Sequence, residues 1–294
     1  MASHHPDPSP APPPSALPRF KGRVAVITGG ARGIGRAHAL ALAREGCDLV
    51  LCDVLEDLPD GTPYPKATQQ DLDRTMEMAT AQGVRCVALK ADVGDPDQAR
   101  QVIDRALSEF DRLDFLVANA GLTLEGPLSE MSAKTFETVI RANLLGVFNV
   151  LSPSLRIMQA QQRGRIVVIG SGLSKHAEAE AGPYTASKFA LVGLVKTAAL
   201  EAAKSGVTVN LVLPGPTDTP MMSSQQRMEE AVPDKIDPSR EDYLQAKKDA
   251  TPMGYAWVKP EDVAAASLFL LSDEARFISG DMLSVDAADC AHWS

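Results

Sequence analysis

Tyr184 and Lys188 are the residues whose types and spacing point most directly to chemistry. They stand four positions apart at the start of a predicted helix, so their side chains lie on one face of it. An ordinary tyrosine has a pKa of ~10 and is a poor base at neutral pH, but a nearby ammonium favours the phenolate and lowers that pKa. The pair could therefore act as a general acid/base. Taken alone, the pattern is more typical of a surface pair on a helix.

Two further polar residues support an active site. Ser171 follows an apolar strand, and a hydroxyl there can donate a hydrogen bond to a substrate oxygen as negative charge develops. Asn143 lies in the middle of a predicted helix, where a polar amide contributes little to the helix itself. With Tyr184, these residues predict an enzyme that uses acid/base catalysis at a substrate oxygen.

A glycine-rich turn joins the first predicted strand to the first predicted helix. Its pattern, Gly29-x3-Gly33-x-Gly35, permits a sharp turn and the close approach of a pyrophosphate to the helix N-terminus. The spacing differs from the common G-x-G-x-x-G fingerprint, and such a turn can also be purely structural. We predict that this turn binds a dinucleotide through Thr28, Gly29, Arg32, Gly33, Ile34 and Gly35.

Asp53 indicates which dinucleotide is bound. It ends the second predicted strand, where a carboxylate binds the adenosine ribose hydroxyls. The same charge repels a 2′-phosphate, so NAD is predicted over NADP, although Arg32 could meet a phosphate. The other predicted cofactor contacts follow strands: Asp92 and Val93 at the adenine, Asn119, Ala120 and Gly121 along the channel, and Pro214, Gly215, Thr217 and Thr219 at the cofactor amide.

These residues need a framework of alternating strands and helices. Such alternation forces parallel pairing with right-handed crossovers. We therefore expect an α/β fold, a single-domain doubly wound Rossmann fold with a seven-stranded parallel sheet and helices on both faces. Its ligand should lie at the carboxyl ends of the strands. The expected strands are 24–28, 48–53, 85–90, 115–118, 165–169, 207–212 and 282–285. The first expected helix follows the glycine-rich turn and ends near residue 45. The other expected helices are 70–82, 96–110, a long helix from about residue 133, and 183–205.

Three segments depart from this alternation. Residues 1–19 are rich in proline and are predicted to form a disordered leader ahead of the domain at 20–294. Residues 54–69 are an insertion after the second strand. Residues 217–256 form a long connection that is polar and rich in methionine, and this segment is predicted to form a lid over the substrate.

The predicted substrate pocket is formed by Gly172, His176, Met221 and Met222. His176 could instead be an ordinary exposed loop residue, and the methionines could serve packing alone. Arg227, Glu229 and Glu230 are expected on a solvated face of the lid.

Composition excludes several other classes of function. The net charge of −9 argues against nucleic acid as a partner, because phosphate binding needs a basic surface. The sequence has no apolar run long enough to span a bilayer and no secretion signal at its start, so we expect no membrane partner. The four cysteines have no spacing typical of a metal site, and we predict no metal. They are expected to be buried free thiols in a cytoplasmic protein.

In combination, the motifs resemble the short-chain dehydrogenase/reductase family over about residues 20–288. They are TGGARGIG, ANAG, the Asn143 helix, Ser171, Tyr184-x3-Lys188 and PGPTDT. The resemblance implies that the serine polarises the carbonyl and that the tyrosine moves the proton. It implies that the lysine binds the nicotinamide ribose and tunes the tyrosine, and that the asparagine holds a relay water. It also implies the interconversion of a secondary alcohol and a ketone by hydride transfer to the B face, and a homotetramer or homodimer.

A closer resemblance is to the carveol-dehydrogenase-like, mycofactocin-associated subgroup. It rests on Pro63-Tyr64-Pro65-Lys66-Ala67-Thr68 with Asp71-Leu72, and on Trp257-Val258-x-Pro260-Glu261-Asp262-Val263. The resemblance implies a small hydrophobic alcohol or ketone, such as a terpenoid, as substrate. It further implies tightly held NAD that is covered by the insertion.

Two alternatives remain open. One is an NADP-dependent carbonyl or 3-oxoacyl reductase of the same family. The other is a nucleotide-binding protein that keeps the fold without turnover, because a fold alone does not establish function.

Overall fold

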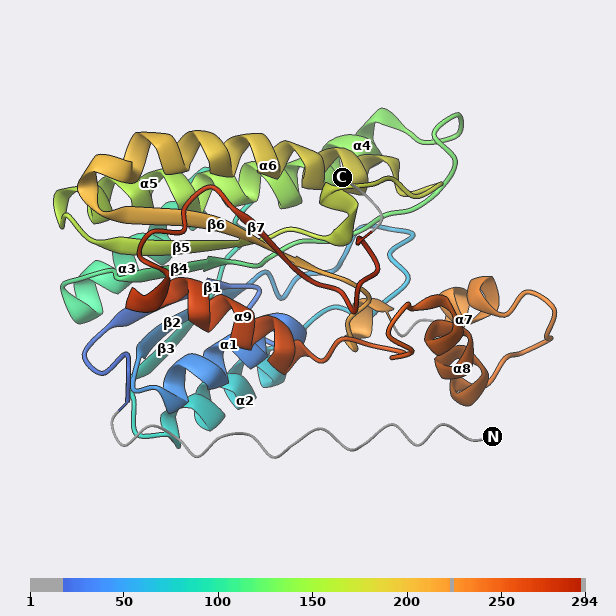
Figure 1. Ribbon diagram of the computed structural model, residues 1–294, viewed down its shortest axis with the longest axis horizontal. Helices are drawn as coiled ribbons and strands as arrows, with labels where there is room; N and C mark the ends of the chain where they lie inside the picture. The colour runs from blue at the N-terminus through green and yellow to red at the C-terminus, as the bar shows by residue number, and fades with distance from the viewer. Residues whose placement is uncertain (1–17, 223–224, 292–294) are drawn as a thin grey trace.

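The computed structural model describes residues 18–222 and 225–291. Within them, seven parallel strands form one sheet in the order β3-β2-β1-β4-β5-β6-β7 (Figure 1). The single doubly wound domain predicted from the sequence is thereby confirmed, while most of the predicted leader lies outside the described residues. The strands are β1 Val24–Thr28, β2 Asp48–Asp53, β3 Cys86–Lys90, β4 Phe115–Ala118, β5 Gly164–Ile169, β6 Val207–Pro214 and β7 Met282–Val285.

Helices cover both faces of the sheet because the strands are apolar on both. Along β1, Val24 and Val26 pack into one core, and Ala25 and Ile27 pack into the other, as the twofold period of a strand requires. The first core is completed by α3 (Pro96–Phe110), α5 (Gly146–Ala160) and α6 (Gly182–Ala202). The second is completed by α1 (Gly33–Arg44), α2 (Gln69–Thr80) and α9 (Pro260–Leu271).

The strand order reverses direction at β1, which lies between β2 and β4. The connections from β1 and β4 therefore leave on opposite faces and open a crevice at the carboxyl ends of these strands. The glycine-rich turn and the segment 119–121 flank this crevice. The fold thus places the predicted dinucleotide site where the sheet itself leaves room.

The long helix expected from residue 133 is interrupted. It consists of α4 (Ala133–Ile140), a π-helical turn at Arg141–Leu145, and α5. A π-helical turn widens the backbone locally and often marks a functional position. Here it carries Asn143, which is completely buried.

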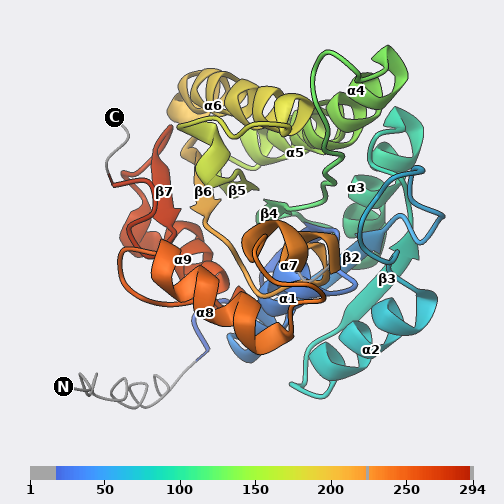
Figure 2. The same ribbon diagram turned by 90° about the vertical axis from the view of Figure 1, so that its right-hand side faces the viewer.

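The lid segment contains the α-helices α7 (Gln225–Ala231) and α8 (Arg240–Ala250). Both lie beyond the carboxyl edge of the sheet, and α7 crosses in front of it (Figure 2). The Tyr243 hydroxyl donates a hydrogen bond to the Met222 carbonyl at 2.9 Å, and the Tyr243 ring meets Trp257 edge to face. None of the described helices is both long and apolar enough to cross a membrane.

Candidate active site

A cavity of about 440 Å³ lies at the carboxyl ends of the strands. Its walls come from the glycine-rich turn, the insertion 54–69, the ends of β2 to β6 and the lid. Of the predicted site residues, three do not line it: Thr28, Gly35 and Asn143. The fold therefore gathers the remaining predicted cofactor, catalytic and pocket residues into one space.

The glycine-rich turn can accept a pyrophosphate. Gly29 has a φ of +65°, and a Cβ on Gly35 would lie 2.0 Å from the Gly29 carbonyl oxygen, so a side chain at Gly35 would break the turn. No side chain caps the first turn of α1. Its N–H groups and positive dipole end therefore face the cavity without a capping oxygen, which suits an anionic ligand.

Thr28 and Asn119 hold this turn in place. The Thr28 hydroxyl oxygen accepts hydrogen bonds from the backbone N–H groups of Asn119 and Ala120, both at 3.0 Å. The Asn119 amide donates to the carbonyls of Thr28 and Gly29. Thr28 is therefore a positioning residue between β1 and β4, and its hydroxyl faces away from the ligand space.

The charges at the ribose end favour a dinucleotide without a 2′-phosphate. The Asp53 carboxylate accepts hydrogen bonds from the N–H groups of Ala31 at 3.1 Å and Val54 at 2.9 Å. Burial raises the pKa of Asp53, and these two hydrogen bonds oppose the shift. The Arg32 guanidinium donates to the carbonyls of Pro65 and Lys66. Arg32 is thus directed to the insertion.

Asp92 is also engaged at this end of the cavity. Its carboxylate pairs with Arg141 at 2.8 Å and accepts a hydrogen bond from Gly94 N–H at 2.8 Å. Asp92 and Val93 both line the cavity, as the sequence predicts. Arg141 was not expected here, because its approach depends on the π-helical turn that begins at this residue.

Ser171, Tyr184 and Lys188 converge at the other end of the cavity. The side chains of Ser171 and Tyr184 are hydrogen-bonded to each other. The Lys188 ammonium lies 5.4 Å from the centre of the Tyr184 ring and donates to the Ile169 carbonyl at 2.9 Å. Three residues from two elements therefore place a hydroxyl, a phenol and an ammonium around one point.

Burial dominates the titration of this group. Removal from water raises the pKa of Tyr184 above its ordinary value of 10, and the hydrogen bond from Ser171 opposes that change. Burial lowers the pKa of Lys188 to about 8. The lowered tyrosine pKa expected from the sequence is therefore wrong for the chain on its own, because loss of solvation outweighs the favourable charges.

Asn143 is linked through Ser187 to the backbone of Tyr184 and connects it to the loop after β4. Its amide oxygen accepts a hydrogen bond from Leu122 N–H at 2.8 Å, and its amide nitrogen donates to the Leu122 carbonyl and the Ser187 hydroxyl. Ser187 in turn donates to the Tyr184 carbonyl at 2.7 Å. Asn143 thereby fixes the backbone that carries the tyrosine.

The substrate end contains the predicted Gly172, His176, Met221 and Met222, but also residues that the sequence did not reveal. Arg227 forms an ion pair with Glu125, and both line the cavity. Only 15% of the Arg227 side chain is exposed, so the expectation of a solvated face is wrong for this residue. No local pattern marks the pair, because its partners lie on the lid and on the loop after β4.

Tyr64 is the third residue that the local pattern did not reveal. It comes from the insertion and lines the cavity, and its hydroxyl accepts a hydrogen bond from Thr123 N–H at 3.2 Å. Burial raises its pKa to about 12, so the phenol stays neutral. The insertion is thereby fastened to the loop after β4 as well as to Arg32.

Comparison with known proteins identifies the class to which this fold and site belong. A family model described as enoyl-(acyl carrier protein) reductase matches residues 29–287. The chain therefore belongs to the short-chain dehydrogenase/reductase family, as its motifs indicated.

Individual relatives extend over nearly the whole chain. The (−)-trans-carveol dehydrogenase of Rhodococcus erythropolis is 37% identical over 273 residues, which are 92% of this chain and 98% of that protein. A 3-oxoacyl-(acyl-carrier-protein) reductase of Thermotoga maritima is 33% identical and covers 91% of this chain and 98% of its own. The crystal structure of carveol dehydrogenase from Mycobacterium avium in complex with NAD has a TM-score of 0.90 at 31% identity, covering 94% of this chain and 100% of that one.

Proposed function

We propose that this chain is an NAD-dependent dehydrogenase that interconverts a secondary alcohol and a ketone. The observation that carries the proposal is the convergence of Ser171, Tyr184 and Lys188 at one end of a cavity whose other end is formed by the glycine-rich turn and Asp53. A dinucleotide bound along this cavity would have its ribose at Asp53, its pyrophosphate at the α1 N-terminus and its nicotinamide near the catalytic group.

Each catalytic side chain has a role that follows from its place. Ser171 donates a hydrogen bond to the substrate oxygen and Tyr184 exchanges a proton with it. Lys188 keeps a positive charge near the phenol, and Asn143 holds the surrounding backbone. NAD supplies the hydride acceptor and, when oxidised, a further positive charge. In that setting the phenolate of Tyr184 becomes easier to form.

NAD rather than NADP is proposed for an electrostatic reason. A 2′-phosphate would meet the Asp53 carboxylate, while the Arg32 guanidinium is held by two carbonyls of the insertion. The NAD in the related Mycobacterium avium structure supports this choice. Residues of the insertion also line the cavity, which supports the proposal that NAD exchanges slowly.

The proposed substrate is a small hydrophobic cyclic alcohol or ketone, of terpenoid or steroid type. The carveol dehydrogenase relatives support this class. The methionines Met221 and Met222 offer an adaptable apolar wall on the lid. Arg227 and Glu125 add one polar contact that would orient a substrate bearing a second oxygen.

The test begins with protein purified without added cofactor. Denaturation and identification of the released nucleotide shows whether NAD or NADP is held, and turnover is then measured with fresh NAD and a panel of cyclic alcohols. Bound NAD(H) with turnover only when an artificial electron acceptor is added would support the tightly held cofactor. Preference for NADPH with 3-oxoacyl substrates would favour the alternative that the Thermotoga maritima relative represents. Bound nucleotide without turnover under any condition would favour the non-catalytic alternative.

The proposal includes a homotetramer or homodimer in the cytoplasm. Leu145, Phe148 and Phe189 on the helical layer are each more than 40% exposed, and such apolar side chains are typical of contacts between subunits. All four cysteines are free, which suits a reducing compartment. The oligomer is tested by light scattering, where Phe148→Glu should reduce the mass.

A further inference from the structure

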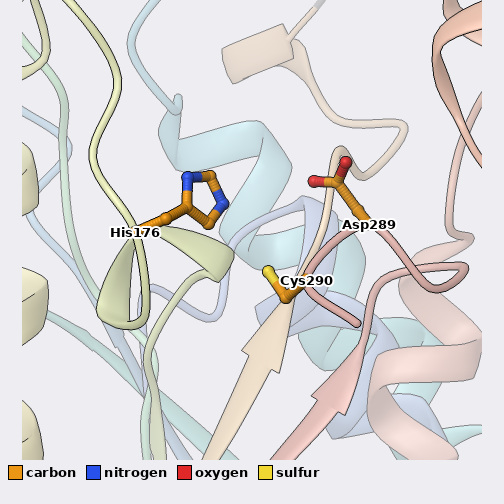
Figure 3. Close-up of side chains that lie close together, drawn as sticks. All are labelled: His176, Asp289 and Cys290. Carbon is orange, nitrogen blue, oxygen red and sulfur yellow. The ribbon is translucent and has the colours of Figure 1, made fainter. Parts of the chain in front are cut away.

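A cluster of three potential metal ligands lies at the rim of the cavity. His176 comes from the turn after β5, and Asp289 and Cys290 come from the segment after β7 (Figure 3). One ligand atom of each residue lies within 4.8 Å of the others. Because the residues are far apart in the sequence, their spacing gave no sign of a metal site.

Gly172 creates the space in which these side chains meet. A Cβ on this residue would lie 3.0 Å from the Cys290 sulfur and 3.5 Å from the His176 Nε2. The sulfur and the ring nitrogen therefore approach the same point over the glycine. A larger residue would push the thiol away, so this convergence depends on the glycine that follows Ser171.

The backbone after β7 holds the two C-terminal ligands in place. Ala287 and Ala288 have φ values of +53° and +70°, a conformation that alanine rarely adopts. The Asp286 carboxylate stabilises it by accepting hydrogen bonds from the N–H groups of Ala288 and Cys290, both at 3.1 Å. Strained backbone of this kind persists where the surrounding contacts enforce it, and it often positions functional groups.

The donor set selects the metal. Imidazole nitrogen, thiolate sulfur and carboxylate oxygen together suit Zn²⁺, whereas Mg²⁺ and Ca²⁺ prefer oxygen alone. One thiolate and one carboxylate would balance the charge of the ion, and the thiol proton would pass to solvent on binding. We propose that His176, Asp289 and Cys290 bind Zn²⁺ at the rim of the substrate cavity, and that the bound ion hinders entry of the alcohol.

The position of the three ligands would place the ion in the path of the substrate. His176 and Asp289 line the same cavity as Ser171 and Tyr184. Three protein ligands leave a fourth position of a tetrahedral ion, which water would fill. An ion there would fasten the C-terminal segment to the turn after β5 and occupy the approach to the phenol. The effect on substrate entry rests on the proposed function, whereas the binding of the metal does not.

Spectroscopic titration with Co²⁺, followed by displacement with Zn²⁺, tests the binding. We expect one equivalent to give the near-ultraviolet thiolate band and visible bands typical of tetrahedral cobalt. Cys290→Ser should abolish the thiolate band, and His176→Gln should weaken binding at least tenfold. Cys86→Ser is the matched control, because Cys86 is a partly exposed thiol on β3 outside the cluster. His4 and His5 are common to all variants and cancel in the comparison.

Absence of the thiolate band in the unaltered chain, or equal affinity in Cys290→Ser, would overturn the site whether or not the protein is a dehydrogenase. If Zn²⁺ binds, it should raise the KM for the alcohol in the unaltered chain and in Cys86→Ser but not in Cys290→Ser. Binding without any change in KM would overturn the effect on substrate entry.

Discussion

Replacement of Lys188 by methionine should separate the activity of this protein from its stability. Lys188 is 4% exposed, and burial lowers its pKa from 10.5 to about 8. The unfolded chain therefore binds more protons than the folded chain between these values, so the fold carries no penalty from this group above pH 10.5 and loses stability as the pH falls to 8. With about 1.4 kcal/mol for each pKa unit, the buried lysine destabilises the fold by about 3 kcal/mol at pH 7.

At pH 9.5 the same pKa values leave a destabilisation of only about 1 kcal/mol. Lys188→Met also removes the hydrogen bond to the Ile169 carbonyl, which costs about 1–3 kcal/mol at either pH. The absolute change in stability is therefore small, but its pH dependence is not. The stability of the variant relative to the unaltered chain should fall by about 2 kcal/mol between pH 7 and 9.5.

Urea unfolding of nucleotide-free protein at the two pH values measures this difference. Lys196→Met is the matched control, because Lys196 lies on the same helix and is exposed. The difference in stability between Lys196→Met and the unaltered chain should be the same at both pH values. Of the two variants, only Lys188→Met should lose turnover. A stability difference for Lys188→Met that stays constant within about 0.5 kcal/mol would refute the argument that burial depresses this pKa.

Four further substitutions test the other parts of the site. Tyr184→Phe should lower kcat by about 10²- to 10⁴-fold while NAD affinity, measured by calorimetry, is unchanged; retained turnover would exclude the tyrosine as proton donor. Asp53→Ala should weaken the binding of NAD by roughly 10- to 150-fold, which is the contribution of a hydrogen bond to a charged group. It should also reduce the preference for NAD over NADP. An unchanged ratio of the two affinities would exclude the ribose contact. Arg227→Gln and Glu125→Gln should each raise KM several-fold through loss of one ion pair, and their effects should not add in the double variant. Additive effects would mean that the residues act separately.

Most of the fold followed from the sequence because each core strand is a short apolar run. The predicted strands and observed strands differ by only a few residues at their ends, as at Arg85, which precedes β3. The site residues that follow the strands could also be predicted from the sequence, because a parallel sheet brings the carboxyl ends of its strands together.

Contacts between distant loops were not visible in the same way. The Arg227–Glu125 pair joins the lid to the loop after β4, and the approach of Cys290 to His176 depends on the turn after β7. Such contacts leave no periodic pattern, because each partner is polar and lies in irregular backbone. The π-helical turn at Asn143 was also missed, because its pattern of apolar residues continues that of the helices on either side.

The two buried charged groups of the cavity are destabilised for the same reason. Asp53 and Lys188 lie at opposite ends of the proposed dinucleotide site, and burial disfavours the charged form of each. Ribose hydroxyls would offer the carboxylate and the ammonium the hydrogen bonds that they lose on leaving water. Ligand that binds only the folded chain stabilises it by mass action, so NAD should raise the midpoint of unfolding. The rise should be smaller in Asp53→Ala, because the carboxylate that the ribose would satisfy is then absent.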